Sequence, residues 1–223
     1  MQNDAKPIRI FFSKMGRAKY ISHLDMARCM QRALKRSKLP VWHTQGFNPR
    51  MYMNFSLALS LGYESLQESF EIKMVPGLGY DVIKARINEV MPEGIVITKV
   101  ANPIMEIKEI DWADYEIFVH FEDTNTEKLK DCYEDFCKKN EIIVSKKSKN
   151  GNKDIDLKPL FSLSDAEIYD DKIKFNARIA SGIILNINPN LIINAFCEGY
   201  ELKPTLVNVK RIKILTDNLI EFE

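Results

Sequence analysis

Residues 7–39 read PIRIFFSKMGRAKYISHLDMARCMQRALKRSKL and predict a strand, a short turn and a long helix in succession. Residues 7–13 are apolar and rich in β-branched and aromatic side chains, which predicts the strand, and the basic, glycine-containing segment after them predicts a turn or loop. Ser22 can cap the helix, with Asp25 in the acidic position of a capping box. We therefore expect the helix to begin at Ile21 or Ser22.

This helix has two sides of different character. Apolar residues recur on one side at helical spacing, namely Leu24, Ala27, Met30 or Gln31, and Leu34. Basic residues recur at i, i+4, i+7 and i+8, namely Arg28, Arg32, Lys35 and Arg36. We expect these bases to form one exposed stripe opposite the apolar side. An ordinary solvated helix face usually mixes both signs, whereas this one has no acid after Asp25, so anion binding is the favoured interpretation.

Each half of the chain shows the same order of elements. In the first half, strands are expected at 7–13, 51–60, 68–75 and 95–100 and helices from about 22 and at 80–91, with 40–44 as a candidate for extra pairing. In the second half, strands are expected at 115–121, 141–147, 172–180 and 207–215 and helices at 125–140 and 190–202. The repeated β-α-β-β-α-β order predicts an α+β protein of two tandem ferredoxin-like domains with antiparallel sheets, residues 1–108 and 109–223.

Charge is distributed unevenly along the 223 residues. The first fifty hold eleven Lys and Arg against two acidic residues, while the remaining residues have a balance of −8. The N-terminal domain is therefore the basic one and is suited to contact anions such as RNA. A composition of 45% hydrophobic and 28% charged residues supports packed cores. The opening residues lack the layout of a secretion signal, and no apolar run approaches the ~20 residues that cross a bilayer. We expect a cytoplasmic protein without a membrane partner.

The QGFNPR loop at residues 45–50 is a second candidate feature. Trp42 precedes it and Tyr52 follows it, so aromatic and basic groups meet on a flexible backbone. Such a set can stack a splayed base and hold its phosphate. Taken singly, Trp42, Phe47 and Tyr52 are each better explained as core residues beneath the loop, but the loop as a unit favours a binding function. The expected RNA-binding residues are Lys14, Arg17, Lys19, His23, Arg28, Arg32, Lys35, Arg36, His43, Gly46, Phe47, Asn48 and Arg50.

Common catalytic and metal-binding signatures are missing from the sequence. It has no GxxxxGK[ST], no GxGxxG after a strand, no GxSxG and no HExxH. The four cysteines form neither a zinc-type pair nor the CxxxCxxC triplet of a radical SAM cluster, and we expect them to be structural thiols. An acid–base set of His23 with Tyr20 and Lys19 is conceivable, but a structural His23 that organises its first turn or the loop at 46–49 is favoured. We expect no catalytic residue, metal or cofactor.

The motifs in residues 8–72, with GR, SHLD, RALKR and GFNP in that order, resemble the opening of a bacterial radical-SAM-associated family of unknown function. In that family the domain occurs alone or fused to a radical SAM protein with a B12-binding-like region. The positions that match are Ser22, His23, Leu24, Asp25, Arg32, Arg36, Gly46, Phe47, Asn48 and Pro49. The family commonly continues GFNP with His-Pro, whereas Arg50 and Met51 follow here, so no role for a histidine after the loop carries over. The resemblance implies an accessory or substrate-presenting module.

The leading hypothesis is an RNA-binding accessory protein, for tRNA or rRNA, that works with a separate radical SAM modifying enzyme. Since the cluster cysteines are missing, the chemistry is assigned to that partner. One alternative is a metal-independent endoribonuclease using His23 or His43 with Tyr20 or Lys19, because tandem ferredoxin-like halves with a basic first helix look like the CRISPR repeat-processing endoribonucleases. Another alternative is a structural partner-binding module that uses the acidic second domain.

Overall fold

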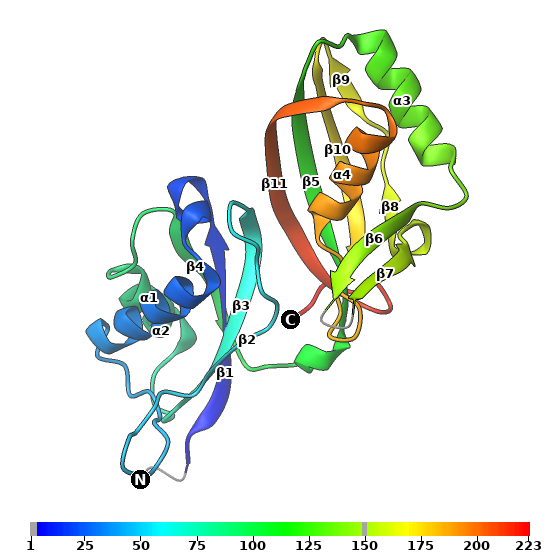
Figure 1. Cartoon of the computed structure of the whole chain (residues 1–223). Helices are drawn as coiled ribbons and strands as arrows, with labels where there is room; N and C mark the ends of the chain where they lie inside the picture. Colours follow the sequence, from blue (N-terminus) through cyan, green and yellow to red (C-terminus); the bar gives the residue numbers. More distant parts are fainter. Residues whose placement is uncertain (1–3, 149–150) are drawn as a thin grey trace. The chain divides into compact units, whose positions relative to one another are not determined.

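The computed structural model describes residues 4–148 and 151–223 (Figure 1). The chain forms two compact units, the first made of the chain up to Glu109 together with Glu221–Glu223, and the second of Ile110–Ile220. Each unit combines antiparallel strands with two α-helices, which confirms the predicted α+β class. None of the helices in the described residues is long and apolar enough to cross a membrane.

The first unit has the predicted order of strands and helices. Its elements are β1 (Lys6–Lys14), the 3₁₀ helix η1 (Gly16–Tyr20), α1 (His23–Arg36), β2 (Met53–Phe55), β3 (Glu64–Met74), α2 (Tyr80–Asn88), β4 (Ile95–Ala101) and the 3₁₀ helix η2 (Ile107–Glu109). The strands pair antiparallel in the order β4-β1-β3-β2. The turn expected after the first strand is thus a 3₁₀ helix, and the strand expected at 51–60 is reduced to three residues. The segment 40–44 pairs only through isolated bridges, from Val41 to Met74 and from His43 to Met51.

Both helices of the first unit pack on the same face of its sheet (Figure 1). Side chains alternate along β1, so Ile8, Ile10 and Phe12 share the face that meets the helices. The helices contribute to this core Met26, Met30 and Leu34 from α1 and Ile83 and Ile87 from α2. Burying one side chain of this kind stabilises the fold by about 1.5–3 kcal/mol. The amphipathic pattern of α1 therefore holds the helix on the sheet and leaves its other side in solvent.

The apolar side of α1 includes Met30 and Leu34, as predicted, but not Leu24. Leu24 is 60% exposed and Ala27 is half-buried, whereas Met26 and Met30 are 4% and 0% exposed. Helical periodicity specifies the spacing of apolar residues but leaves open which of two neighbouring rows faces the sheet. In the structure, Met26, Met30, Ala33 and Leu34 form the buried side of the helix.

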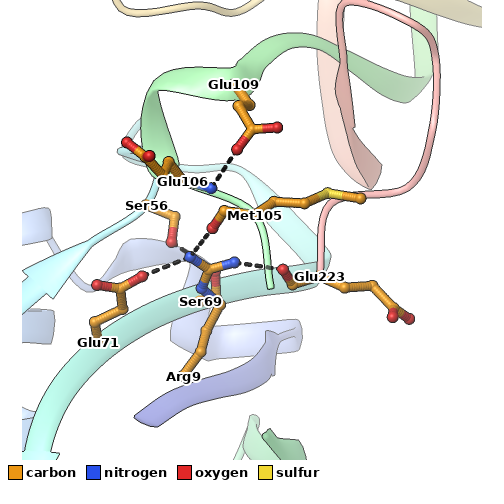
Figure 2. A network of polar contacts seen from close by, with 8 residues as sticks. All are labelled: Arg9, Ser56, Ser69, Glu71, Met105, Glu106, Glu109 and Glu223. Atoms are coloured by element: carbon orange, nitrogen blue, oxygen red, sulfur yellow. Dashed lines mark hydrogen bonds and ion pairs between the residues drawn. The ribbon is translucent and has the colours of Figure 1, made fainter. Parts of the chain in front are cut away.

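The opposite face of the first sheet holds a buried arginine (Figure 2). The Arg9 guanidinium donates to a carboxylate oxygen of Glu71 at 2.5 Å. It also donates to the backbone carbonyls of Met105 and Glu223, at 2.6 Å each. The ring centroid of Phe222 lies 4.2 Å from the guanidinium carbon. These contacts compensate the buried charge and hold the last three residues in the first unit, although the sequence analysis assigned them to the second domain.

The second unit has more strands than expected. Its elements are β5 (Ile110–Glu122), α3 (Thr126–Lys138), β6 (Ile143–Ser148), β7 (Gly151–Asp156), the 3₁₀ helix η3 (Lys158–Leu160), β8 (Phe161–Leu163), β9 (Glu167–Tyr169), β10 (Lys172–Ala180), α4 (Pro189–Gly199) and β11 (Lys203–Thr216). The main antiparallel sheet of this unit runs β11-β5-β10, and β8 and β9 both pair with β10. The helices α3 and α4 meet through their aromatic side chains, with the ring centroids of Phe136 and Phe196 5.3 Å apart.

The strand predicted at 141–147 does not join the main sheet of the second unit. Instead, β6 pairs with β7 in a separate two-stranded sheet, and the place beside β10 is taken by β8 and β9, which the sequence analysis did not predict. A hairpin between strands that are close in sequence closes only a short loop, which costs little entropy. Phe161 of β8 is 8% exposed while Ile143 of β6 is 52% exposed, so β8 supplies the apolar side chain that completes the core.

Candidate nucleic-acid interface

The start of α1 is capped by Ser22, as predicted. The Ser22 hydroxyl oxygen accepts a hydrogen bond from the Asp25 amide (3.1 Å), and the hydroxyl donates to the Asp25 carboxylate (2.8 Å). The Ser22 hydroxyl, followed by the Arg28 guanidinium, holds the pKa of Asp25 below its ordinary value. Asp25 is therefore ionised at neutral pH and lies 3.0 Å from Arg28. The helix is held firmly in its first turn.

The outer side of α1 carries a set of four exposed bases. This α1 base row consists of Arg28, Arg32, Lys35 and Arg36. Arg36 donates a hydrogen bond to the carbonyl of Val90, beyond the end of α2, at 2.7 Å. Within the described part of the chain, no carboxylate lies within ion-pair distance of Arg32 or Lys35. Their charges are therefore available to an anion from solution.

Lys14 does not join this surface, contrary to the sequence prediction. Its side chain is buried, and its ammonium group donates to the carbonyls of Ile21 (2.8 Å) and Lys19 (3.3 Å). Burial lowers the pKa of Lys14, against an opposing effect of the Glu68 carboxylate. The alternation of β1 puts Lys14 on the same face as Phe12, and this was the signal available in the sequence. Lys14 shapes the turn that precedes α1.

The 3₁₀ helix before α1 presents two other predicted bases. Arg17 is exposed, and Lys19 is half-buried with its ammonium group 5.4 Å from the ring centroid of Tyr20. The Met15 amide ties this segment to the carbonyl of Gly94 at 2.7 Å. Gly94 has φ +83°, and a Cβ there would lie 2.5 Å from the carbonyl oxygen of Met15. A glycine at this position therefore allows the close approach that holds the segment in place.

The loop at residues 44–50 is a closed turn with an aromatic residue exposed on it. The Thr44 amide donates to the Arg50 carbonyl (2.8 Å), and the Arg50 amide donates to the Thr44 hydroxyl (2.9 Å). Gly46 has φ +135°, which side chains other than glycine rarely adopt. Phe47 is fully exposed. The other exposed residues of the loop are Gln45, Gly46, Asn48, Pro49 and Arg50. The Phe47 ring is thus outside the core and accessible for stacking.

A lysine that the sequence analysis missed lies against the aromatic residues flanking this loop. The Lys73 ammonium group of β3 is 5.4 Å from the ring centroid of Trp42 and 5.3 Å from that of Tyr52. These distances fit cation–π contacts. His43 Nδ1 lies 3.0 Å from the carbonyl oxygen of Val41, within hydrogen-bond distance. Only the pairing of distant strands brings Lys73 here, so no local motif could have indicated it.

A groove of about 300 Å³ lies between α1 and β2. It is lined by His23, Ala27, Gln31, Met53, Asn54, Phe55 and Ala58. The ring centroids of His23 and Phe55 are 5.0 Å apart in an edge-to-face arrangement. His23 therefore packs on β2, whereas the sequence analysis expected it to organise its first turn or the loop at 46–49. The i, i+4, i+8 spacing of His23, Ala27 and Gln31 places the three residues on one flank of the helix, and this spacing was the sign of the groove in the sequence.

A family of uncharacterised proteins conserved in bacteria, DUF2344, matches residues 7–189 of this chain. The chain belongs to this family. A chain in the crystal structure of a Cbf5-Nop10-Gar1 complex is similar in fold, with a TM-score of 0.51 at 10% identity; the match covers 96% of this chain and 49% of that one. The present chain thus spans about half the length of that relative.

A second solved structure is much less similar in fold. A chain in the crystal structure of an unknown protein from Galdieria sulphuraria covers 93% of this chain and 98% of its own length at 12% identity, but its TM-score is 0.25. No curated protein matches the sequence.

Among the described residues, histidine and cysteine side chains are not gathered into a metal-binding cluster. In the residues that the structure describes, no group of three or more His, Cys, Asp or Glu side chains could hold a metal ion. His120 Nε2 lies 2.8 Å from the Asp171 carboxylate in the second unit. Burial is the largest cause that raises the pKa of all four thiols, those of Cys29, Cys132, Cys137 and Cys197. A raised pKa lowers the fraction of each thiol that is ionised at neutral pH, and the thiolate is the nucleophilic form.

Proposed function

We propose that this protein binds RNA, either tRNA or rRNA, through its first unit and acts as an accessory to a separate radical SAM modifying enzyme. The observation that carries the proposal is the α1 base row, four exposed bases on one capped helix. Each phosphate that such a group neutralises releases condensed counterion, which favours binding of a polyanion. Arg32 and Lys35 contribute most to this argument because no carboxylate in the described residues pairs with them.

The loop at 44–50 supports single-stranded RNA as the ligand. The fully exposed Phe47 ring offers a base a surface for stacking, and Arg50 in the same loop offers a charge for its phosphate. Stacking on an aromatic side chain contributes about 1–3 kcal/mol per base. Bases in a paired helix are already stacked on each other, so this contact favours loops, bulges and ends of an RNA.

The proposal includes a ferredoxin-like architecture for both units. The order β4-β1-β3-β2 with both helices on one face supports this class for the first unit. In the second unit, β11-β5-β10 with β8 and β9 at the edge supports the same arrangement, once the β6–β7 hairpin is treated as an insertion.

A protein-binding role for the second unit is favoured by an apolar loop between β10 and α4. Ile183, Ile184 and Leu185 are 69%, 100% and 40% exposed. The Ile187 amide closes the loop by donating to the Ala180 carbonyl at 2.9 Å. Contiguous exposed apolar groups of this kind mark interaction sites. We assign this loop to the radical SAM enzyme, the partner that the sequence resemblance implies.

Crosslinking in cells tests the RNA proposal. The full chain would be crosslinked by ultraviolet light and purified, its RNA sequenced and its crosslinked peptides identified by mass spectrometry. We expect enriched tRNA or rRNA, with crosslinks in residues 15–55. Crosslinks confined to the second unit, or no RNA above an unirradiated control, would contradict the proposal. Cleavage of RNA by the purified protein in EDTA, lost in His23→Ala with binding intact, would replace it with the endoribonuclease alternative.

A co-purification experiment tests the protein-binding role. Ile184→Asp should abolish the complex with a co-expressed radical SAM enzyme while leaving RNA binding unchanged, because a charge in an apolar contact is costly to bury. Retention of the complex would exclude this loop as the docking site.

A further inference from the structure

The groove between α1 and β2 combines an aromatic wall with unengaged amide groups. Phe55 is half-buried, and its ring is held by Phe70 and Phe12, at centroid distances of 5.3 and 6.3 Å. The Gln31 and Asn54 side chains are exposed at the groove. In the part of the chain that the structure describes, neither amide takes part in a hydrogen bond within the protein. The groove therefore presents two side-chain amides that can hydrogen-bond to a ligand, beside an apolar surface formed by the Phe55 ring.

This combination matches the chemistry of a nucleobase. A base has a flat face that packs on aromatic and apolar groups, and an edge that carries both hydrogen-bond donors and acceptors. A carboxamide also has an acceptor oxygen and a donor nitrogen, so Gln31 and Asn54 can each pair with such an edge. A volume of about 300 Å³ is at the lower end of ligand pockets, which suits one small planar group rather than a large ligand.

The groove also adjoins the α1 base row. Lys35 follows Gln31 by four residues, so it lies one helical turn further along the same flank. Arg28 follows Ala27 directly and lies on the adjoining outer side. A nucleotide whose base enters the groove would thus have cationic side chains within reach of its phosphates. A metabolite without phosphates would make no use of these charges.

We propose that this groove takes up one unstacked nucleobase of single-stranded RNA and reads its edge through Gln31 and Asn54. The inference rests on the proposed RNA-binding function and names the recognition element of that function. A base in a duplex is covered on both faces by its neighbours and cannot enter the groove. The protein should therefore discriminate between bases, and it should bind single strands better than duplexes.

Homopolymer binding tests the inference. The full chain would be titrated with fluorescein-labelled 12-mers of rU, rA and rC and with a 12-bp RNA duplex. We expect the wild type to bind one homopolymer about 5-fold or more tighter than the others. Gln31→Ala/Asn54→Ala should remove this preference, while its salt dependence stays that of the wild type because no charge is altered. Asn194→Ala, which removes an exposed amide from α4, is the matched control.

The possible outcomes separate the inference from the function on which it rests. If all three homopolymers bind with equal affinity, or if the double variant keeps the wild-type preference, the groove does not read bases and RNA binding stands. If the duplex binds with the same affinity as the single strands, the inference about the groove is likewise wrong while RNA binding stands. No binding of any RNA would overturn both. Photocrosslinking of a 4-thiouridine 12-mer should label the peptides that contain His23 and Phe55, and labels elsewhere alone would reject the groove.

Discussion

The strongest test of the RNA proposal is removal of Arg32 and Lys35, the two bases of α1 for which no ion pair is found in the described residues. Arg32→Gln/Lys35→Gln keeps polar side chains of similar size and removes two positive charges from an exposed helix face. Glutamine is a good helix former, so α1 should remain folded. We expect the double variant to bind single-stranded RNA more weakly, and with less dependence on salt, than the wild type.

The expected change in the salt dependence of RNA affinity follows from the number of exposed bases. Six of the predicted contact residues are exposed bases, namely Arg17, Arg28, Arg32, Lys35, Arg36 and Arg50. Six phosphate contacts to a single strand give a slope of log affinity against log salt of about −4.2, which is about a 300-fold loss between 50 and 200 mM. With two contacts removed, the slope becomes about −2.8 and the loss about 50-fold.

Fluorescence anisotropy with a labelled 12-mer RNA at four salt concentrations between 50 and 200 mM measures both slopes. Lys128→Gln/Lys130→Gln is the matched control, because it removes the same two charges from exposed positions of α3 in the second unit. The control should keep the wild-type slope. A wild-type slope in the α1 variant, or an equal reduction in the α3 variant, would refute the assignment of the phosphate contacts to α1.

Three further predictions concern the fold that supports this surface. Gly94→Ala should lower the free energy of unfolding by about 1–3 kcal/mol in urea titrations, because its Cβ would meet the Met15 carbonyl in a left-handed backbone conformation; unchanged stability would show that this approach is not tight. Arg9→Met should lower the free energy of unfolding by about 3 kcal/mol, since it leaves Glu71 without its buried partner. No change in this free energy in the same urea titration would argue against the network of Figure 2. Burial raises the pKa of Cys197 to about 11, so iodoacetamide at pH 8 should label it only after unfolding, and rapid labelling of the native protein would contradict its burial.

The sequence alone determined the features that depend on neighbouring residues. The order of elements in the first unit, the Ser22 cap and the solvent exposure of the basic side of α1 all follow from spacing and capping chemistry within a few residues. The loop at 44–50 was likewise predicted from Gly46 and from the Asn48-Pro49 pair, which both favour a turn. The cap and the loop closure are bonds between residues close in sequence, so their strength depends little on how the chain folds elsewhere.

Only the tertiary structure decided the features that depend on distant partners. Whether Met26 or Leu24 faces the core was settled by the sheet against which α1 packs, because periodicity sets the spacing of a row and not its direction. The inward turn of Lys14, the approach of Lys73 to two aromatic rings and the return of Phe222 to Arg9 depend likewise on strands far apart in sequence. A local pattern carries no information about such pairings, since their energies arise only when the remote surfaces meet and exclude water.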